Sequence, residues 1–158
     1  MLDFDNLQTY RENNRIEAKQ ALGGLPESIW ETYSAFANAD GGIILLGVEE
    51  LPDKSLHALD LLDPQWLIDD FRTILEDPRR VSGNILTEDD VQVHEVDGKH
   101  IIAITVPKAP PSVRPIYIDG DLYRGTYRRR GEGDYRCTTE EIDAMLAEKE
   151  NLLRRKST

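Results

Sequence analysis

The chain has 158 residues, of which 39% are hydrophobic and 31% are charged, and its formal net charge is −11. This length suits one domain with its own hydrophobic core, and this composition excludes an intrinsically disordered chain. The longest apolar run is too short to cross a bilayer, and the acidic start lacks the regions of a secretory signal. A lone cysteine excludes an internal disulfide, so we expect a cytoplasmic protein with no membrane partner.

The negative charge is unevenly spread along the chain. Residues 108–136 contain seven Lys or Arg and four Asp or Glu, so this segment is net positive within an acidic protein. An acidic body repels nucleic-acid phosphates, whereas a local basic segment is typical of surfaces that bind them. The charge pattern therefore keeps nucleic-acid binding open and directs attention to one segment.

The first third of the sequence predicts a strand, a helix and a second strand. Residues 15–21 alternate between polar and apolar side chains, as a half-buried strand does. Residues 26–38 carry apolar side chains at helical spacing, and a turn with two glycines ends this helix. Residues 43–48 are wholly apolar, which predicts a strand that is covered on both faces.

The middle of the sequence predicts a helix followed by a hairpin. A helix is expected over residues 64–77, because an Asp-Pro pair supplies its N-cap and first position and a proline at 78 stops it. Residues 91–96 and 100–106 are rich in β-branched side chains and flank an Asp-Gly pair, which is a strong hairpin signal.

The last part predicts a linker, a second hairpin and a terminal helix. Residues 108–115 are rich in proline and should be extended, while residues 115–118 and 122–129 flank another Asp-Gly pair. A capping box starts a helix over residues 139–150. The order of elements predicts an α+β fold, a mixed twisted sheet with flanking helices, in a single domain spanning residues 1–158.

Three parts of the sequence resemble one known family. Residues 11–19 resemble the entry motif of the Schlafen AlbA-like domain, with two glutamates five residues apart and a lysine two residues beyond the second. Residues 35–48 resemble the most recognisable motif of that family, and residues 115–118 with 125–134 are similar to its closing hairpin. Together these motifs span about residues 11–146.

The resemblance implies a DNA-binding α+β domain at the N-terminus of bacterial transcriptional regulators or helicase-related ATP-binding proteins. It therefore implies that this chain is the N-terminal part of a longer regulator. Two positions depart from the family pattern. Ala18 replaces a usual aromatic residue, which suggests altered packing, and Glu50 stands where Asp is common, which leaves a longer side chain at any acidic site.

The first candidate site is basic and lies on the second predicted hairpin. Its nucleic-acid-binding candidates are Arg124, Tyr127, Arg128, Arg129 and Arg130. Alternation along a strand through residues 122–130 puts Arg124, Arg128 and Arg130 on one face and Tyr127 with Arg129 on the other. Arginines at this spacing can follow a phosphate backbone, and tyrosines can stack on unpaired bases. The alternative is a solvated face whose arginines pair with acids of the same domain.

The second candidate site is acidic. Glu17 and Lys19 share a strand face, Glu12 precedes them, and Glu50 ends the central strand, so these side chains meet if the two strands are neighbours. In the animal Schlafens this domain resembles an RNA endonuclease with three acids at matching positions. That match implies Glu12, Glu17 and Glu50 as ligands of Mg²⁺ or Mn²⁺, with Glu49 as an alternative to Glu50. Surface pairing of these glutamates with nearby basic residues is the competing interpretation.

Three functions follow from these candidates. The favoured one is a DNA- or RNA-binding domain of a bacterial transcriptional regulator. A metal-dependent endoribonuclease is the enzyme alternative, and we favour it less. A protein-interaction domain that forms a homodimer is the third.

Overall fold

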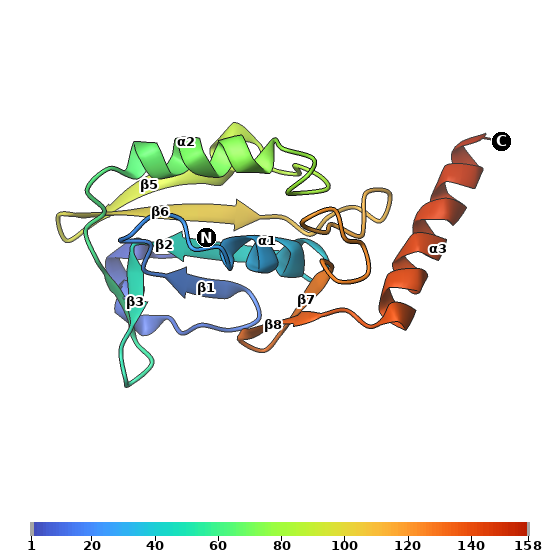
Figure 1. Ribbon diagram of the computed structural model, residues 1–158. Coiled ribbons are helices and arrows are strands. Elements are labelled where there is room, and N and C mark those ends of the chain that lie inside the picture. Colours follow the sequence, from blue (N-terminus) through green and yellow to red (C-terminus); the bar gives the residue numbers. More distant parts are fainter. Residues whose placement is uncertain (1, 158) are drawn as a thin grey trace.

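The computed structural model describes residues 2–157, and its main element is a four-stranded mixed sheet (Figure 1). The strand order is β1 (Ile16–Lys19), β2 (Gly42–Leu46), β6 (Lys99–Val106) and β5 (Val91–Val96). β1 and β2 are parallel, and the other neighbours are antiparallel. The predicted α+β fold with a mixed sheet and flanking helices is confirmed.

Helices cover one face of this sheet and smaller elements cover the other. The helices α1 (Ile29–Ala37) and α2 (Pro64–Leu75) pack on the inward side chains of β2 and β6. The opposite face packs against the 3₁₀ helix η1 (Phe4–Thr9) and the hairpin of β3 (Val48–Glu50) with β4 (Leu56–Ala58). Both faces of β2 are therefore buried, as its unbroken apolar sequence predicts.

The local signals for α2 and for the hairpin of β5 and β6 act as expected. Asp63 caps α2 by accepting a hydrogen bond from Trp66 N at 3.1 Å, with Pro64 at the first helical position. Asp97 and Gly98 both have positive φ in the tight turn between the two strands. A short 3₁₀ helix, η2 (Glu88–Asp90), leads into β5.

Two predicted strands differ from the structure. The run at residues 43–48 is not one strand, because the chain turns at Gly47 and Val48 enters a separate two-stranded sheet. The last hairpin lies further along the chain than predicted: it pairs β7 (Tyr127–Arg130) with β8 (Gly133–Arg136). Only the isolated bridge between Tyr117 and Thr126 remains of the expected pairing in the described chain.

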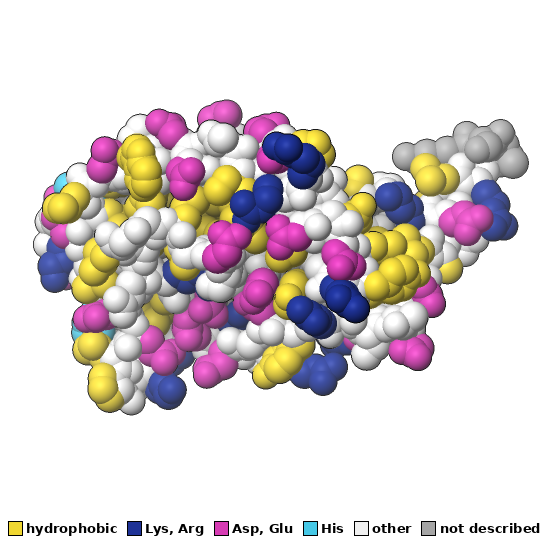
Figure 2. All heavy atoms as spheres, viewed as in Figure 1, with side chains coloured by type: hydrophobic (Ala, Val, Ile, Leu, Met, Phe, Trp, Pro, Cys, Tyr) yellow, Lys and Arg dark blue, Asp and Glu magenta, His cyan; other side chains and the backbone are white. Residues whose placement is uncertain are grey.

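The β7–β8 hairpin and the helix α3 (Thr139–Ser157) lie at one end of the molecule (Figure 1). The Thr138 capping box begins α3: Thr138 N donates to Glu141 Oε1 and Glu141 N donates to Thr138 Oγ1. α3 continues past residue 150, where we expected it to end, and projects away from the sheet. The space-filling view shows basic groups near this junction and acidic groups scattered over the visible body (Figure 2).

Candidate functional site

The helix α1 positions β7 through two buried polar side chains. Ser34 Oγ donates to Ile116 O at 2.7 Å and accepts from Tyr127 N at 3.0 Å. Asn38 Nδ2 donates to Ile116 O at 2.8 Å and to Tyr127 O at 3.0 Å, and its Oδ1 accepts from Ile116 N at 2.8 Å. These bonds satisfy backbone groups that the main sheet does not pair, so α1 fixes the hairpin relative to the core.

Side chains alternate along β7, as the sequence predicts for this stretch. Tyr127 and Arg129 are buried against α1, whereas Arg128 is half-buried and Arg130 is exposed on the outer face. Arg124 lies outside the strand, in a turn where its backbone N donates to Asp121 Oδ1. The five basic-site candidates therefore do not form one surface.

Arg129 of β7 is buried and contacts three other elements, β1, β8 and α1. Its Nη2 donates to Asn13 O at 2.9 Å and Ile16 O at 3.1 Å and pairs with Glu17 Oε1 at 3.0 Å. Its Nη1 donates to Asp134 Oδ1 at 2.8 Å, and its guanidinium lies 5.0 Å from the centre of the Phe36 ring. With its side chain fully enclosed, Arg129 has no surface to offer phosphate.

Tyr127 is also withdrawn from solvent, with 8% of its surface exposed. Tyr135 is the aromatic residue that the outer face presents: it is 57% exposed and lies directly opposite Arg128 in the hairpin register. Its ring lies across Gly133, where a Cβ would come within 2.8 Å of it. The sequence interpretation missed Tyr135 because it placed the hairpin turn at Asp119-Gly120 and no strand beyond residue 130, although the Gly131-Glu132 pair offers a second turn signal.

The outer face of the β7–β8 hairpin is therefore defined by Arg128, Arg130 and Tyr135. Arg128 pairs with Glu141 of α3. Arg130 makes no side-chain hydrogen bond or ion pair with any residue in 2–157. This face holds two cations and one exposed ring within a single cross-strand patch.

The three glutamates of the acidic site converge on Glu12. Glu17 projects from β1 and Glu50 from β3, and hydrogen bonding to both carboxyl groups helps to raise the pKa of Glu12 to about 8. The largest cause of this raised pKa is burial, and the negative charge of Glu17 adds to it. The structure thus selects Glu50 over Glu49, which faces His57 across the β3–β4 register.

The acidic cluster already has protein partners. Glu12 Oε2 accepts a hydrogen bond from Ala18 N at 2.9 Å, Glu17 pairs with Arg129, and Glu50 pairs with Lys54 at 3.5 Å. Lys19 lies on the same strand face as Glu17, but its Nζ donates to Ser28 Oγ at 3.0 Å.

Hard carboxylate oxygens suit Mg²⁺ or Mn²⁺, so the donor chemistry of the acidic cluster is right for such an ion. Within residues 2–157, however, no three His, Cys, Asp or Glu side chains are arranged to hold a metal. The carboxyl groups as placed bond to one another and to protein donors, and Arg129 neutralises one of them. As placed, these carboxyl groups are occupied by protein partners and do not form an open coordination shell.

Comparison with known proteins decides the family. The model of the Schlafen AlbA_2 family matches residues 12–138. The chain belongs to the Schlafen AlbA_2 family. The resemblance inferred from its motifs is thereby confirmed.

Solved structures related to this AlbA_2 domain include one from Nitrosomonas europaea. It is the N-terminal domain of a protein whose name describes it as related to the ATP-dependent DNA helicase RecG. The two sequences are 32% identical and the TM-score is 0.62. The match covers 85% of this chain and 90% of that one.

A Corynebacterium diphtheriae protein shares the fold at 21% identity and a TM-score of 0.56, over 84% of this chain. The match covers 23% of that protein. No curated protein matches the sequence. None of the helices described in residues 2–157 has the length and apolar character needed to span a membrane.

Proposed function

We propose that this AlbA_2 domain binds nucleic acid through the outer face of the β7–β8 hairpin. The observation that carries the proposal is the cross-strand patch of Arg128, Arg130 and Tyr135, two arginines beside an exposed ring. Guanidinium groups bind phosphate with two donors, and a tyrosine ring stacks on a base of any sequence. The relationship to the N-terminal domain of a protein named after DNA helicases supports the same function.

We further propose that the domain serves a larger bacterial transcriptional regulator. Two points support this proposal: the resemblance implies a domain at the start of longer proteins, and the structurally similar C. diphtheriae protein is much longer than this chain. The local positive patch on an acidic chain suits this role, because it allows binding at one surface while the rest of the body repels nucleic acid.

The direct test is fluorescence anisotropy with labelled single-stranded DNA, single-stranded RNA and duplex DNA at low salt. We expect binding that weakens as salt increases, because phosphate contacts release counterions. The R128A/R130A double variant should bind about 10-fold or more weakly, since two charge-assisted contacts are lost. Arg79→Ala is the matched control, because Arg79 is an exposed arginine that pairs with Asp77 away from the hairpin.

Unchanged affinity in R128A/R130A would remove the hairpin from the interface. If no probe binds even at low salt, the nucleic-acid proposal fails. A protein-interaction or homodimer function then takes its place, and sedimentation would test it.

A metal-dependent endoribonuclease is a second candidate, favoured by the convergence of Glu12, Glu17 and Glu50. In this proposal the three carboxylates hold Mg²⁺ or Mn²⁺, which would activate water for phosphodiester cleavage. Holding the ion requires Glu12 to lose its proton and the cluster to exchange its protein partners for the cation.

Two measurements test the enzyme candidate. Structured RNA incubated with Mn²⁺ should be cleaved by the native protein and not by Glu17→Ala. Independently, Mn²⁺ should raise the melting temperature of the native protein but not that of Glu12→Gln, because an ion that binds the folded chain stabilises it. The absence of both effects contradicts the candidate.

A further inference from the structure

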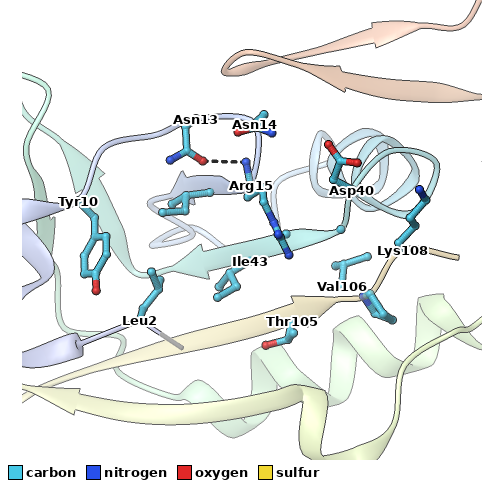
Figure 3. A pocket seen from close by; sticks show the side chains of 14 residues that line it. Leu2, Tyr10, Asn13, Asn14, Arg15, Asp40, Ile43, Thr105, Val106 and Lys108 are labelled. Carbon is cyan, nitrogen blue, oxygen red and sulfur yellow. Dashed lines mark hydrogen bonds between the residues drawn. The ribbon is translucent and has the colours of Figure 1, made fainter.

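Two hollows adjoin on the side of the molecule where β2 begins. The larger has a volume of about 580 Å³ and lies over the start of β1 and β2 and the end of β6 (Figure 3). The smaller has a volume of about 460 Å³ and lies between the end of α1, the segment after β6, β7 and α3. Asp40 and Lys108 line both hollows, which therefore adjoin at these two residues, and together we call them the groove.

The smaller hollow is lined by four cations and by two carboxylates, Asp40 and Glu141, of which Glu141 pairs with Arg128. Lys108, Arg114 and Arg128 line it, and Lys108 makes no side-chain hydrogen bond or ion pair with any other described residue. Arg114 has a side chain that is only 13% exposed, and its Nη2 lies 3.6 Å from Glu148 Oε2, beyond hydrogen-bond distance. Among buried side-chain atoms in residues 2–157, its Nε is the one that has no hydrogen-bond partner.

A charged group that is mostly buried and only loosely paired is costly for the fold. An anion in the smaller hollow would lower this cost, because a phosphate group can accept hydrogen bonds from Arg114 at shorter distance than Glu148 does. This feature is independent of the outer face of the hairpin, with which it shares only Arg128.

The larger hollow has a different character. Its floor is formed by Ile43 from β2 and by Thr105, which lies opposite it on β6, and Asn13, Asn14 and Tyr10 stand around it (Figure 3). A flat ring can lie on such a floor while amide groups meet its polar edge, and the volume is within the usual range for a small-molecule site. Arg15 also lines this hollow, and its side chain has no partner among the described residues.

We propose that the groove holds a single nucleic-acid strand, with a phosphate between Lys108, Arg114 and Arg128 and one unstacked base on the floor formed by Ile43 and Thr105. The inference rests on the proposed nucleic-acid function. It adds that the bound nucleic acid is single-stranded and that it contacts a second surface besides the hairpin. A paired base cannot enter the larger hollow, so the groove selects single strands over duplexes.

Helix α3 supplies an internal competitor for this phosphate. Glu141 pairs with Arg128 and Glu148 pairs with Arg114, and their spacing of seven residues puts both on the same face of the helix. A phosphate in the smaller hollow competes with Glu148 for Arg114 and with Glu141 for Arg128. Removing the charge of Glu148 should therefore strengthen binding.

The test measures anisotropy of labelled ten-nucleotide strands of thymidine or uridine, a strand of the same length without bases, and a blunt duplex. The native chain should bind the strands with bases about 10-fold more tightly than the abasic strand, because base stacking adds to the phosphate contacts. The duplex should bind more weakly than the single strands.

Three variants test the phosphate position. Lys108→Gln with Arg114→Gln should weaken single-strand binding about 10-fold, and Lys108→Gln alone, at an exposed position, should weaken it while leaving the melting temperature unchanged. Glu148→Gln should tighten binding several-fold. Glu150→Gln is the matched control, because Glu150 lies on the same helix and pairs with Arg154.

The outcomes separate this inference from the proposed function. If native protein binds and R128A/R130A weakens it, but the Lys108, Arg114 and Glu148 variants have no effect, the groove is excluded and the hairpin function stands. If abasic and base-containing strands bind equally tightly, or if duplex and single strand do, the claim that an unstacked base lies in the larger hollow is wrong. Displacement of the strand by inorganic phosphate, with no preference for bases, reduces the groove to an anion site and contradicts the proposal.

Discussion

Three consecutive arginines in β7 occupy three different environments. Arg128 pairs with α3, Arg129 is enclosed beside Glu17 and Asp134, and Arg130 is exposed. Their positions, and not their chemistry, decide their roles, because alternation turns Arg129 toward α1 and its neighbours toward solvent. Arg129 contributes to the proposed interface only by holding the hairpin against β1.

Replacing Arg129 should therefore damage the fold. Arg129→Ala leaves two carboxylates buried without their partner, so we expect the free energy of unfolding to fall by about 3–5 kcal/mol in urea denaturation. Arg130→Ala, on the exposed face of the same strand, should change it by less than about 0.5 kcal/mol. Equal effects of the two substitutions would refute the buried role of Arg129.

The raised pKa of Glu12 predicts how stability depends on pH. The pKa of Glu12 rises from an ordinary 4.5 to about 8 in the folded chain, so folding favours the protonated carboxyl. The contribution of Glu12 to stability is present in full below pH 4.5 and is lost as pH rises through about 8. Glu12→Gln, which keeps a neutral acceptor for Ala18 N, should remove that loss.

Urea denaturation of the native chain and Glu12→Gln across this pH interval, in buffer with EDTA, measures the effect. The difference in free energy of unfolding should grow in favour of the variant as pH increases. Parallel pH profiles would show that Glu12 titrates normally.

Among the elements, the β2–β3 junction determines where Glu50 points. Gly47 has a φ of +80°, and a Cβ there would lie 2.6 Å from Leu61 Cγ. The turn directs β3 out of the main sheet, toward β4 and toward Glu12. A residue with a side chain at this position would meet both backbone strain and a packed neighbour.

Gly47→Ala should lower the free energy of unfolding by more than Gly98→Ala does. Gly98 has a similar φ of +76° but open space around its Cα, so its substitution reports the backbone strain alone, about 1–2 kcal/mol. The excess for Gly47 measures the contact with Leu61. Equal losses in thermal or urea denaturation would show that this packing is unimportant.

Local sequence signals predicted most elements but misplaced the last hairpin. The helix from Pro64 and the hairpin about Asp97-Gly98 follow from an N-cap and a turn dipeptide, which act over a few residues. In the last hairpin two turn signals compete. Asp121 closes a local turn with Arg124 and Gly125 through its own side chain and carbonyl, so pairing is delayed to Tyr127.

The candidate site was predictable only in part for a related reason. Motif spacing could bring Glu12, Glu17 and Glu50 to one place, since Glu17 lies in β1, Glu12 lies just before that strand, and Glu50 ends β3. The partners that neutralise them come from distant segments: Arg129 lies more than a hundred residues from Glu17 in the chain. Periodicity carries no information about such contacts, nor about the groove lined by Lys108 and Arg114.

The whole molecule combines an acidic body with a basic end. The chain carries −11, while the β7–β8 hairpin and the groove bring Lys108, Arg114, Arg128 and Arg130 to one end of it. Association with nucleic acid should therefore be confined to that end and should weaken with salt, because the remaining surface is repulsive.

The most direct test of this account is a map of amide chemical-shift changes in a ¹⁵N-labelled domain as a short single-stranded oligonucleotide is added. We predict that the largest changes fall on Arg128, Arg130 and Tyr135 of the β7–β8 hairpin and on Lys108 in the adjoining groove. Changes confined to α2 and β5, or no changes at low salt, would contradict the assignment of this end of the molecule to nucleic-acid binding.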